Sequence, residues 1–188
     1  MSKLTLVIAA TAVSLVTAPM AQAAPYEFAG VYVGAHAGYL DIDADFSGGS
    51  DGGTMGGMQA GYNVIDGNLM WGFEFDVSLT DASVCCSIDT HMIGTIRPRV
   101  GYAVDDWLIY ATGGLASVQF DKFDGFDGSF GWTLGAGVER MLGDIIGIKL
   151  EYRYMQFDNV EQGITSPAGK SPIDFKMHTV MGGVNVHF

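Results

Sequence analysis

The sequence predicts an all-β fold: an eight-stranded antiparallel transmembrane β-barrel with short periplasmic turns and longer extracellular loops. Three observations lead to this prediction. An N-terminal segment has the layout of an export signal, about eight later stretches alternate between apolar and polar residues, and the connections between them are alternately long and short. After the export segment, the chain contains no run of ~18 apolar residues, so no transmembrane helix is expected.

The export segment occupies residues 1–23. A positively charged start is followed by an apolar run over about 4–16 and then by the small-residue pattern Ala21-Gln22-Ala23. This order is typical of a secretory signal peptide cleaved after Ala23. A membrane-anchoring helix is the alternative, but the run is short for a span of ~20 residues. We therefore expect an outer-membrane β-barrel domain over 24–188.

The composition excludes some classes of partner and fold. The 188 residues include 21 Asp and Glu but only 9 Lys and Arg, for a formal net charge of −12. Such a chain has no basic surface to neutralise phosphates, so we expect no nucleic acid as a partner. With 48% hydrophobic residues, the chain is not of a disordered composition.

The two cysteines, Cys85 and Cys86, are adjacent. Neighbouring cysteines cannot close a loop between distant segments, so they cannot staple the fold as an ordinary disulfide does. A strained vicinal disulfide, two free thiols and an intermolecular bridge all remain open. We interpret the pair as a feature of a loop rather than as a redox or metal site.

The alternating stretches define the expected strands and their faces. In the clearest one, large apolar residues such as Trp71 alternate with polar residues such as Glu74, and we expect the apolar face to meet lipid. Gly113-Gly114 blurs the alternation of the fifth stretch, and Pro98 predicts a bulge or local irregularity in the fourth because proline cannot donate to a ladder. The stretches lie at about 30–40, 55–65, 69–79, 91–102, 107–118, 129–141, 146–157 and 174–188.

The connections alternate in length. Short turns are expected at "DGN" 66–68, "VDD" 104–106 and "GD" 143–144, and longer loops at 41–54, 80–90, 119–128 and 158–173. Short turns at one rim and long loops at the other are typical of an outer-membrane barrel with both termini in the periplasm. A soluble β-sandwich, which also alternates, is the main alternative.

Charged residues fall on the face opposite the large apolar ones. An eight-stranded barrel has an interior just wide enough for side chains to fill, and charges enclosed there must pair because an unpaired buried charge is costly. We interpret the set as an ion-paired plug, with a polar constriction of a narrow pore as the alternative. The set comprises four acids, Glu74, Asp76, Glu139 and Glu151, and four bases, Arg97, Arg99, Lys149 and Arg153.

We expect no catalytic residue, no cofactor and no metal site, and we therefore expect that the protein is not an enzyme. None of the histidines, His36, His91, His178 and His187, stands in a recognisable Ser/His/acid pattern, and we interpret His178 as an interfacial residue. The "DIDAD" at 41–45 has acids at calcium-like spacing. It lacks the glycine and the final acid of an EF-hand loop, so we interpret it as a solvated acidic loop. The aromatics of 119–128 fit either a recognition tip or packing on the barrel rim.

Motifs spread over 26–188 carry a resemblance to a known family. The segments "FAGVYVGAHAGY", "WGFEFDVS", "IRPRVGY", "YATGGLA", "GWTLGAGVE", "KLEYRYMQF" and "GGVNVHF" occur in this order. They resemble the small outer-membrane β-barrel or porin family of Gram-negative surface proteins, to which opacity-type adhesins and OmpA-like barrels are related. Arg97-Pro98-Arg99 departs from the small residue usual between the two arginines. Because members differ widely in role, the resemblance implies the fold and the outer membrane more strongly than one function.

The resemblance also implies a role for the last residue and a set of partners. Phe188, the aromatic end of an alternating strand, looks like the signal that the barrel-assembly machinery reads. The implied function is that of an integral, non-enzymatic outer-membrane surface protein that supports the envelope and presents acidic loops, with a small diffusion channel (porin) as the alternative. Outer-membrane lipid, lipopolysaccharide and a host or envelope partner at the loops are the other implied partners.

Overall fold

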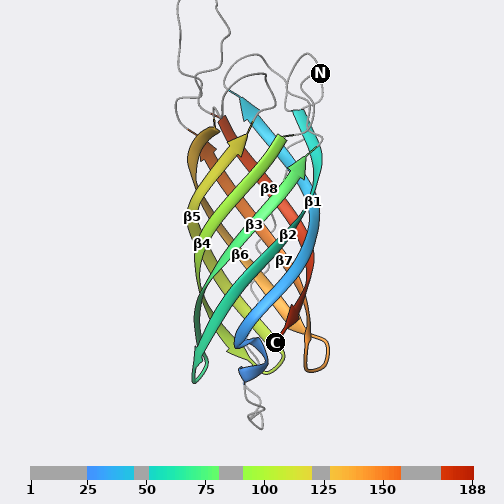
Figure 1. Ribbon diagram of the computed structural model, residues 1–188, viewed down its shortest axis with the longest axis vertical. Helices are drawn as coiled ribbons and strands as arrows, with labels where there is room; N and C mark the ends of the chain where they lie inside the picture. The colour runs from blue at the N-terminus through green and yellow to red at the C-terminus, as the bar shows by residue number, and fades with distance from the viewer. Residues whose placement is uncertain (1–24, 45–50, 81–90, 120–127, 158–174) are drawn as a thin grey trace, which may run out of the picture.

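The computed structural model describes residues 25–44, 51–80, 91–119, 128–157 and 175–188. Within these residues a short 3-10 helix precedes eight antiparallel strands, which close into one barrel in sequence order (Figure 1). The predicted eight-stranded antiparallel barrel is confirmed. The elements are η1 (Pro25–Phe28), β1 (Gly30–Ala44), β2 (Asp51–Asp66), β3 (Leu69–Thr80), β4 (His91–Val104), β5 (Trp107–Gln119), β6 (Gly128–Met141), β7 (Ile146–Phe157) and β8 (Phe175–His187).

The barrel closes between its first and last strands. β1 pairs with β8 from Tyr32 opposite His187 up to Ala44 opposite Phe175. The backbone N–H of Phe188 then donates to the carbonyl oxygen of Val31, with 2.9 Å between the two atoms. Closure satisfies the backbone groups of both strands, which is what a sheet surrounded by lipid requires.

The two faces of the barrel wall have opposite character. Along β3, Trp71 and Phe73 are 55% and 54% exposed on the outer face, whereas Glu74 and Asp76 are fully buried on the inner face. An apolar outer surface around a charged interior is expected where the surrounding solvent is lipid, so the β-sandwich alternative is wrong. Within the described ranges, no helix is long and apolar enough to span a membrane.

Three short turns connect the strands at one end of the barrel, which we call the turn end. Gly67, Asp105 and Gly143 take positive φ values of 61°, 52° and 79° in the turns after β2, β4 and β6. Tight turns of this kind favour glycine and aspartate because these residues tolerate the left-handed conformation. All three turns lie where the sequence predicts them. We call the opposite end, from which the longer connections leave, the loop end.

The first two strands are longer than predicted. β1 continues to Ala44 and β2 starts at Asp51, so the predicted loop 41–54 is wrong at both ends, and Asp41 and Asp43 belong to a strand. The physical reason is that backbone pairing with both β2 and β8 continues beyond the apolar part of β1. An outward residue there no longer has to be apolar, and Asp41 is exposed. This extended backbone is also unlike a curved calcium-binding loop.

Several sequence predictions fall outside the described residues and stay predictions. They concern the export segment, the cysteine pair, the remaining parts of the long connections and the side chain of His91.

Pro98 interrupts one ladder without changing its register. Between β4 and β5, Ile96 pairs with Leu115 and Arg99 with Thr112, and the two intervening residues on each strand are unpaired. Equal numbers on both strands mean that no residue is inserted, so the irregularity is a gap in pairing and not a bulge. The Thr112 hydroxyl donates to the Pro98 carbonyl at 3.0 Å across this gap.

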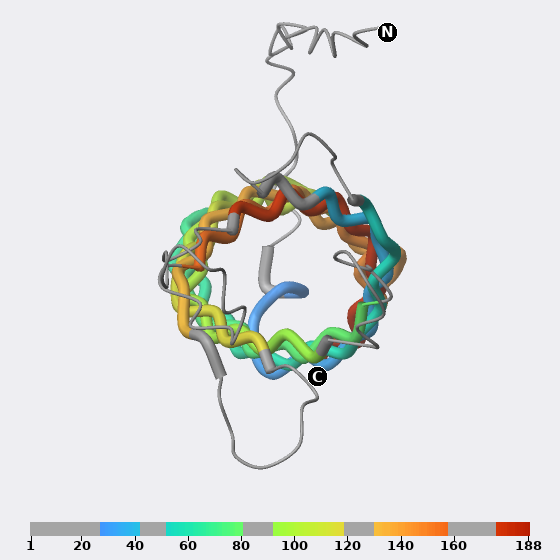
Figure 2. Tube along the Cα trace, turned by 90° about the horizontal axis from the view of Figure 1, so that it is seen from above, coloured from blue at the N-terminus to red at the C-terminus, as the bar shows by residue number. Residues whose placement is uncertain are grey.

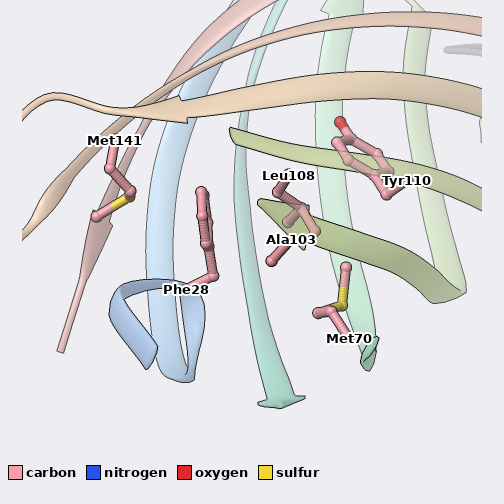
Figure 3. Close-up of a cluster of buried hydrophobic side chains, with 6 residues drawn as sticks. All are labelled: Phe28, Met70, Ala103, Leu108, Tyr110 and Met141. Atoms are coloured by element: carbon pink, nitrogen blue, oxygen red, sulfur yellow. The ribbon is translucent and has the colours of Figure 1, made fainter. Parts of the chain in front are cut away.

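The interior is apolar at both ends and charged between them. At the turn end, η1 curls inside the ring of strands (Figure 2) and inserts Phe28 among residues of β3 to β6 (Figure 3). We call this the turn-end cluster: Phe28, Met70, Ala103, Leu108, Tyr110 and Met141. Two apolar groups fill the loop end, with Met177 packed against both, and together we call them the loop-end cluster: Ile93, Ala116, Val118, Met155 and Phe157, and Leu40, Met55 and Met181.

Candidate functional site

The candidate site is the charged layer of the lumen, between the two apolar clusters. All eight charged residues predicted to face inward lie there, at most 4% exposed. Since inward positions recur every second residue along a strand, pairs and triplets come from the same strand. β3 carries Glu74 and Asp76, β4 carries Arg97 and Arg99, β6 carries Glu139, and β7 carries Lys149, Glu151 and Arg153.

Arg97 is the centre of this layer. One terminal nitrogen, Nη2, contacts Glu74 and lies 3.0 Å from Oδ2 of Asp76, while Nη1 lies 2.6 Å from Oε1 of Glu151. The planar guanidinium can hold several carboxylates at once because its donors point in fixed directions. Arg97 therefore links its neighbouring strand β3 with β7 on the other side of the lumen.

Two further bases join the same carboxylates. Nη1 of Arg153 lies 3.1 Å from Oδ1 of Asp76, and its Nη2 lies 2.9 Å from Oε1 of Glu151. Nζ of Lys149 lies 3.2 Å from Oε2 of Glu74 and 3.5 Å from Oε2 of Glu151. β3 and β7 are four strands apart in either direction around the barrel. The ion pairs between them therefore cross the lumen from wall to wall.

Arg99 forms the part of the layer nearer the turn end. Its Nη2 lies 3.3 Å from Oε2 of Glu139, and its Nη1 lies 3.4 Å from Oε2 of Glu74. The guanidinium carbon stands 4.0 Å from the ring centre of Tyr110 and 5.3 Å from that of Tyr32. Aromatic faces attract a guanidinium, so Arg99 is held by rings as well as by carboxylates.

Uncharged and histidine side chains complete the hydrogen bonding, and sequence reasoning missed them as members. Period-two alternation could have found Tyr32, which shares the inward parity of His36, but Tyr110 lies in the strand whose facing was ambiguous. Tyr32 donates to Glu74 at 2.8 Å, and Tyr110 donates to Glu151 at 2.7 Å. Around Glu139, Asn185 donates to the carboxylate at 2.6 Å, and Nε2 of His187 lies 2.9 Å from Oε1. Gln59 in turn donates to Asn185 at 2.5 Å.

A serine and a histidine meet in the lumen although no sequence pattern indicated it. Nε2 of His36 lies 2.8 Å from Oγ of Ser78, and its Nδ1 lies 3.0 Å from Oε1 of Gln59. The two side chains meet because Gly57, on the strand between them, has no side chain. The third partner is an amide instead of the acid of a hydrolytic triad, and Ser78 is fully buried. This pair is therefore not arranged to attack a substrate.

Two predicted residues lie outside the lumen. His178 is half-buried on the outer face, where its Nδ1 lies 2.6 Å from the hydroxyl of Tyr152 and its ring packs edge-on against Tyr154. Phe188 is 78% exposed at the turn end, next to the closing strands. Among the described residues, no group of three or more His, Cys, Asp or Glu side chains is placed to hold a metal ion.

Comparisons with known proteins point in one direction. A family model described as "Outer membrane protein beta-barrel domain" matches residues 8–188. The chain is 32% identical over 175 residues to a 25 kDa outer-membrane immunogenic protein of Brucella canis, covering 85% of this chain and 79% of that protein. It is 33% identical over 178 residues to a 22 kDa outer membrane protein of Rhizobium leguminosarum bv. viciae, covering 89% and 83%.

A solved structure has the same fold. The crystal structure of Neisserial surface protein A matches with a TM-score of 0.58 at 22% sequence identity, and the match covers 85% of this chain and 98% of that one.

Proposed function

The chain belongs to the outer membrane protein β-barrel domain family, and from this premise we propose that it is a non-enzymatic surface protein with a closed lumen. The relatives are named outer-membrane proteins, and the closed barrel of this chain crosses that membrane with its strands. In this proposal the barrel supports the envelope, and the connections at the loop end are presented outside the cell. One relative is described as immunogenic, and exposure of these connections is the property that would bring them into contact with antibodies.

The ion pairs that cross the lumen carry the proposal of a closed barrel. Arg97 and Arg153 join carboxylates of β3 and β7, and both arginines are fully buried. A charge lining a water-filled path would be touched by water, whereas these guanidiniums have no surface that water can reach. A small diffusion channel, the alternative function, would have to break several buried pairs, each of which is costly to separate.

Export, assembly and partners complete the proposal. Residues 1–23 would direct the chain to the periplasm and be removed, and Phe188 would be read by the barrel-assembly machinery. Outer-membrane lipid and lipopolysaccharide would surround the outer face, and a host or envelope partner would bind the acidic connections. The acidity of the chain supports a partner that is cationic or that is bridged by divalent cations.

Conductance is the experiment that tests the closed lumen. Refolded protein in a planar lipid bilayer is expected to give no reproducible single-channel steps, because the buried ion pairs that cross the lumen would obstruct a water path. A difference in gel mobility between the unheated and the heated sample would establish that the protein is folded. Vesicles that carry the protein and an entrapped small dye should retain the dye, and flotation with the vesicles would establish insertion.

Discrete steps of one reproducible size from folded, inserted protein would contradict the proposal and favour the channel. Protein unfolded by heat before addition is the control, since any steps it gives come from bilayer damage and not from the barrel.

A further inference from the structure

A depression lies on the outer face of the barrel close to the loop end. It has a volume of about 340 Å³, which is within the range of small-ligand sites. It opens toward the lipid side of the wall and crosses four neighbouring strands, β3 to β6. Residues around it include Phe75, Gly94, Ile96, Leu115, Ser117 and Phe130. We call it the outer notch.

The register of four strands explains the outer notch. One row across the wall reads Val77, Gly94, Ser117 and Phe130, so its two central positions carry no side chain and a small one. A Cβ added at Gly94 would meet only the backbone oxygen of Asp76, at 3.9 Å. The next row toward the turn end reads Phe75, Ile96, Leu115 and Trp132. Large side chains therefore surround a place where the wall is thin.

The outer notch lies close to the loop end of the barrel wall. Gly94 is the fourth residue of β4, and Ser117 is the third residue from the end of β5. With ~3.3 Å per residue and a strand tilt of ~40°, the notch lies roughly 5–8 Å below the loop-end limits of these strands. With the loop end outside the cell, as proposed above, the notch lies on the half of the barrel wall that faces the outer leaflet.

We propose that the outer notch binds an acyl chain of lipopolysaccharide from the outer leaflet. The inference deepens the proposed function, in which lipopolysaccharide surrounds the barrel. The notch is continuous with the lipid-facing apolar surface that flanks it at Phe75, Ile96, Leu115 and Phe130, which are 52–74% exposed. A hollow left empty beside lipid would lose the dispersion contacts of its lining, and a flexible hydrocarbon chain can fill it.

A hydroxyl group favours lipopolysaccharide over phospholipid. The notch has two polar lining residues with hydroxyls, and one of them, Thr95, donates inward to Asp76. The other, Ser117, is half-buried at an outward position. Acyl chains of lipid A carry 3-hydroxyl groups, whereas phospholipid chains do not. A hydrogen bond between such a group and Ser117 would satisfy both hydroxyls in a medium without water.

Filling the notch is the test. Gly94→Leu and, as an independent variant on another strand, Ser117→Leu would be refolded in bilayers that contain lipid A and phospholipid of matched chain length. Native mass spectrometry after mild detergent extraction would count the lipids that each barrel retains. The wild type is expected to retain one lipid A, and both variants to show roughly fivefold to tenfold lower occupancy because the side chain removes the dispersion contacts of the bound chain.

Gly182→Leu is the matched control. Gly182 also faces outward in a strand, and a Cβ there meets only one backbone oxygen, at 3.9 Å, but it lies on β8, far around the barrel from β4. This variant should retain lipid A like the wild type. Equal loss in all three variants, retention of phospholipid in place of lipid A, or a dimer that only the notch variants lose would each overturn the inference. The conductance experiment is independent, so a silent barrel without lipid A retention would remove the notch site and leave the closed lumen intact.

Discussion

Replacing Arg97 with alanine is expected to lower the free energy of unfolding by about 3–5 kcal/mol, the usual cost of removing one partner of a buried ion pair. Arg97 is fully buried and contacts Glu74, Asp76 and Glu151. Without its guanidinium, the three carboxylates would repel one another in a region that water does not reach. Urea unfolding of the refolded protein in lipid vesicles, followed by tryptophan fluorescence, would measure the loss.

Arg140→Ala is the control for Arg97→Ala because it changes the net charge by the same amount. Arg140 is exposed on the outer face near the turn end, where its guanidinium carbon lies 5.2 Å from the ring centre of Trp107. Loss of an exposed cation–π contact costs about 0.5–1 kcal/mol.

The double variant Arg97→Ala with Glu74→Ala should recover part of the stability lost in Arg97→Ala, since contacting residues are energetically coupled. An unchanged midpoint for Arg97→Ala would mean that the ion pairs do not hold the barrel together.

Truncating Phe28 is expected to cost about 3 kcal/mol, at the lower end for a buried phenylalanine because η1 lies near the chain start and can partly relax. Phe28 is fully buried in the turn-end cluster, and its ring lies edge-on to His187 with 6.0 Å between the ring centres. Its carbonyl oxygen accepts a hydrogen bond from Asn63 at 3.0 Å. Phe28→Ala would leave a cavity and weaken the docking of η1. The same urea unfolding experiment would measure this.

The control for Phe28 is a volume-conserving change in the same cluster. Met70→Leu is expected to cost less than about 1.5 kcal/mol because the cluster stays filled. Hydrogen exchange of the η1 amides would add a second readout, with faster exchange expected in Phe28→Ala alone. If Phe28→Ala and Met70→Leu were equally stable, η1 would not contribute to the closure of the turn end.

The faces of the strands could be predicted from the sequence because alternation has a period of two residues. The eight charged residues of the lumen follow from that rule alone. Their partners do not, because Arg97 and Glu151 are brought together by the stagger of strands around the closed barrel, which no local pattern encodes. Tyr110 was missed for a local reason: the neighbouring Gly113-Gly114 hides the alternation of its strand. The end of β1 could not be predicted because its last residues include Asp41 and Asp43, which break the apolar alternation.

The ion pairs between β3 and β7 also give the barrel a mechanical property. They brace the wall from inside, because Arg153 on β7 reaches Asp76 on the opposite strand β3, and Lys149 on β7 reaches Glu74 on β3. A hollow tube of the same wall could flatten under the lateral pressure of the surrounding bilayer. The ion pairs oppose such flattening. The barrel is therefore expected to keep a constant cross-section and a constant perimeter for the lipids that pack against it.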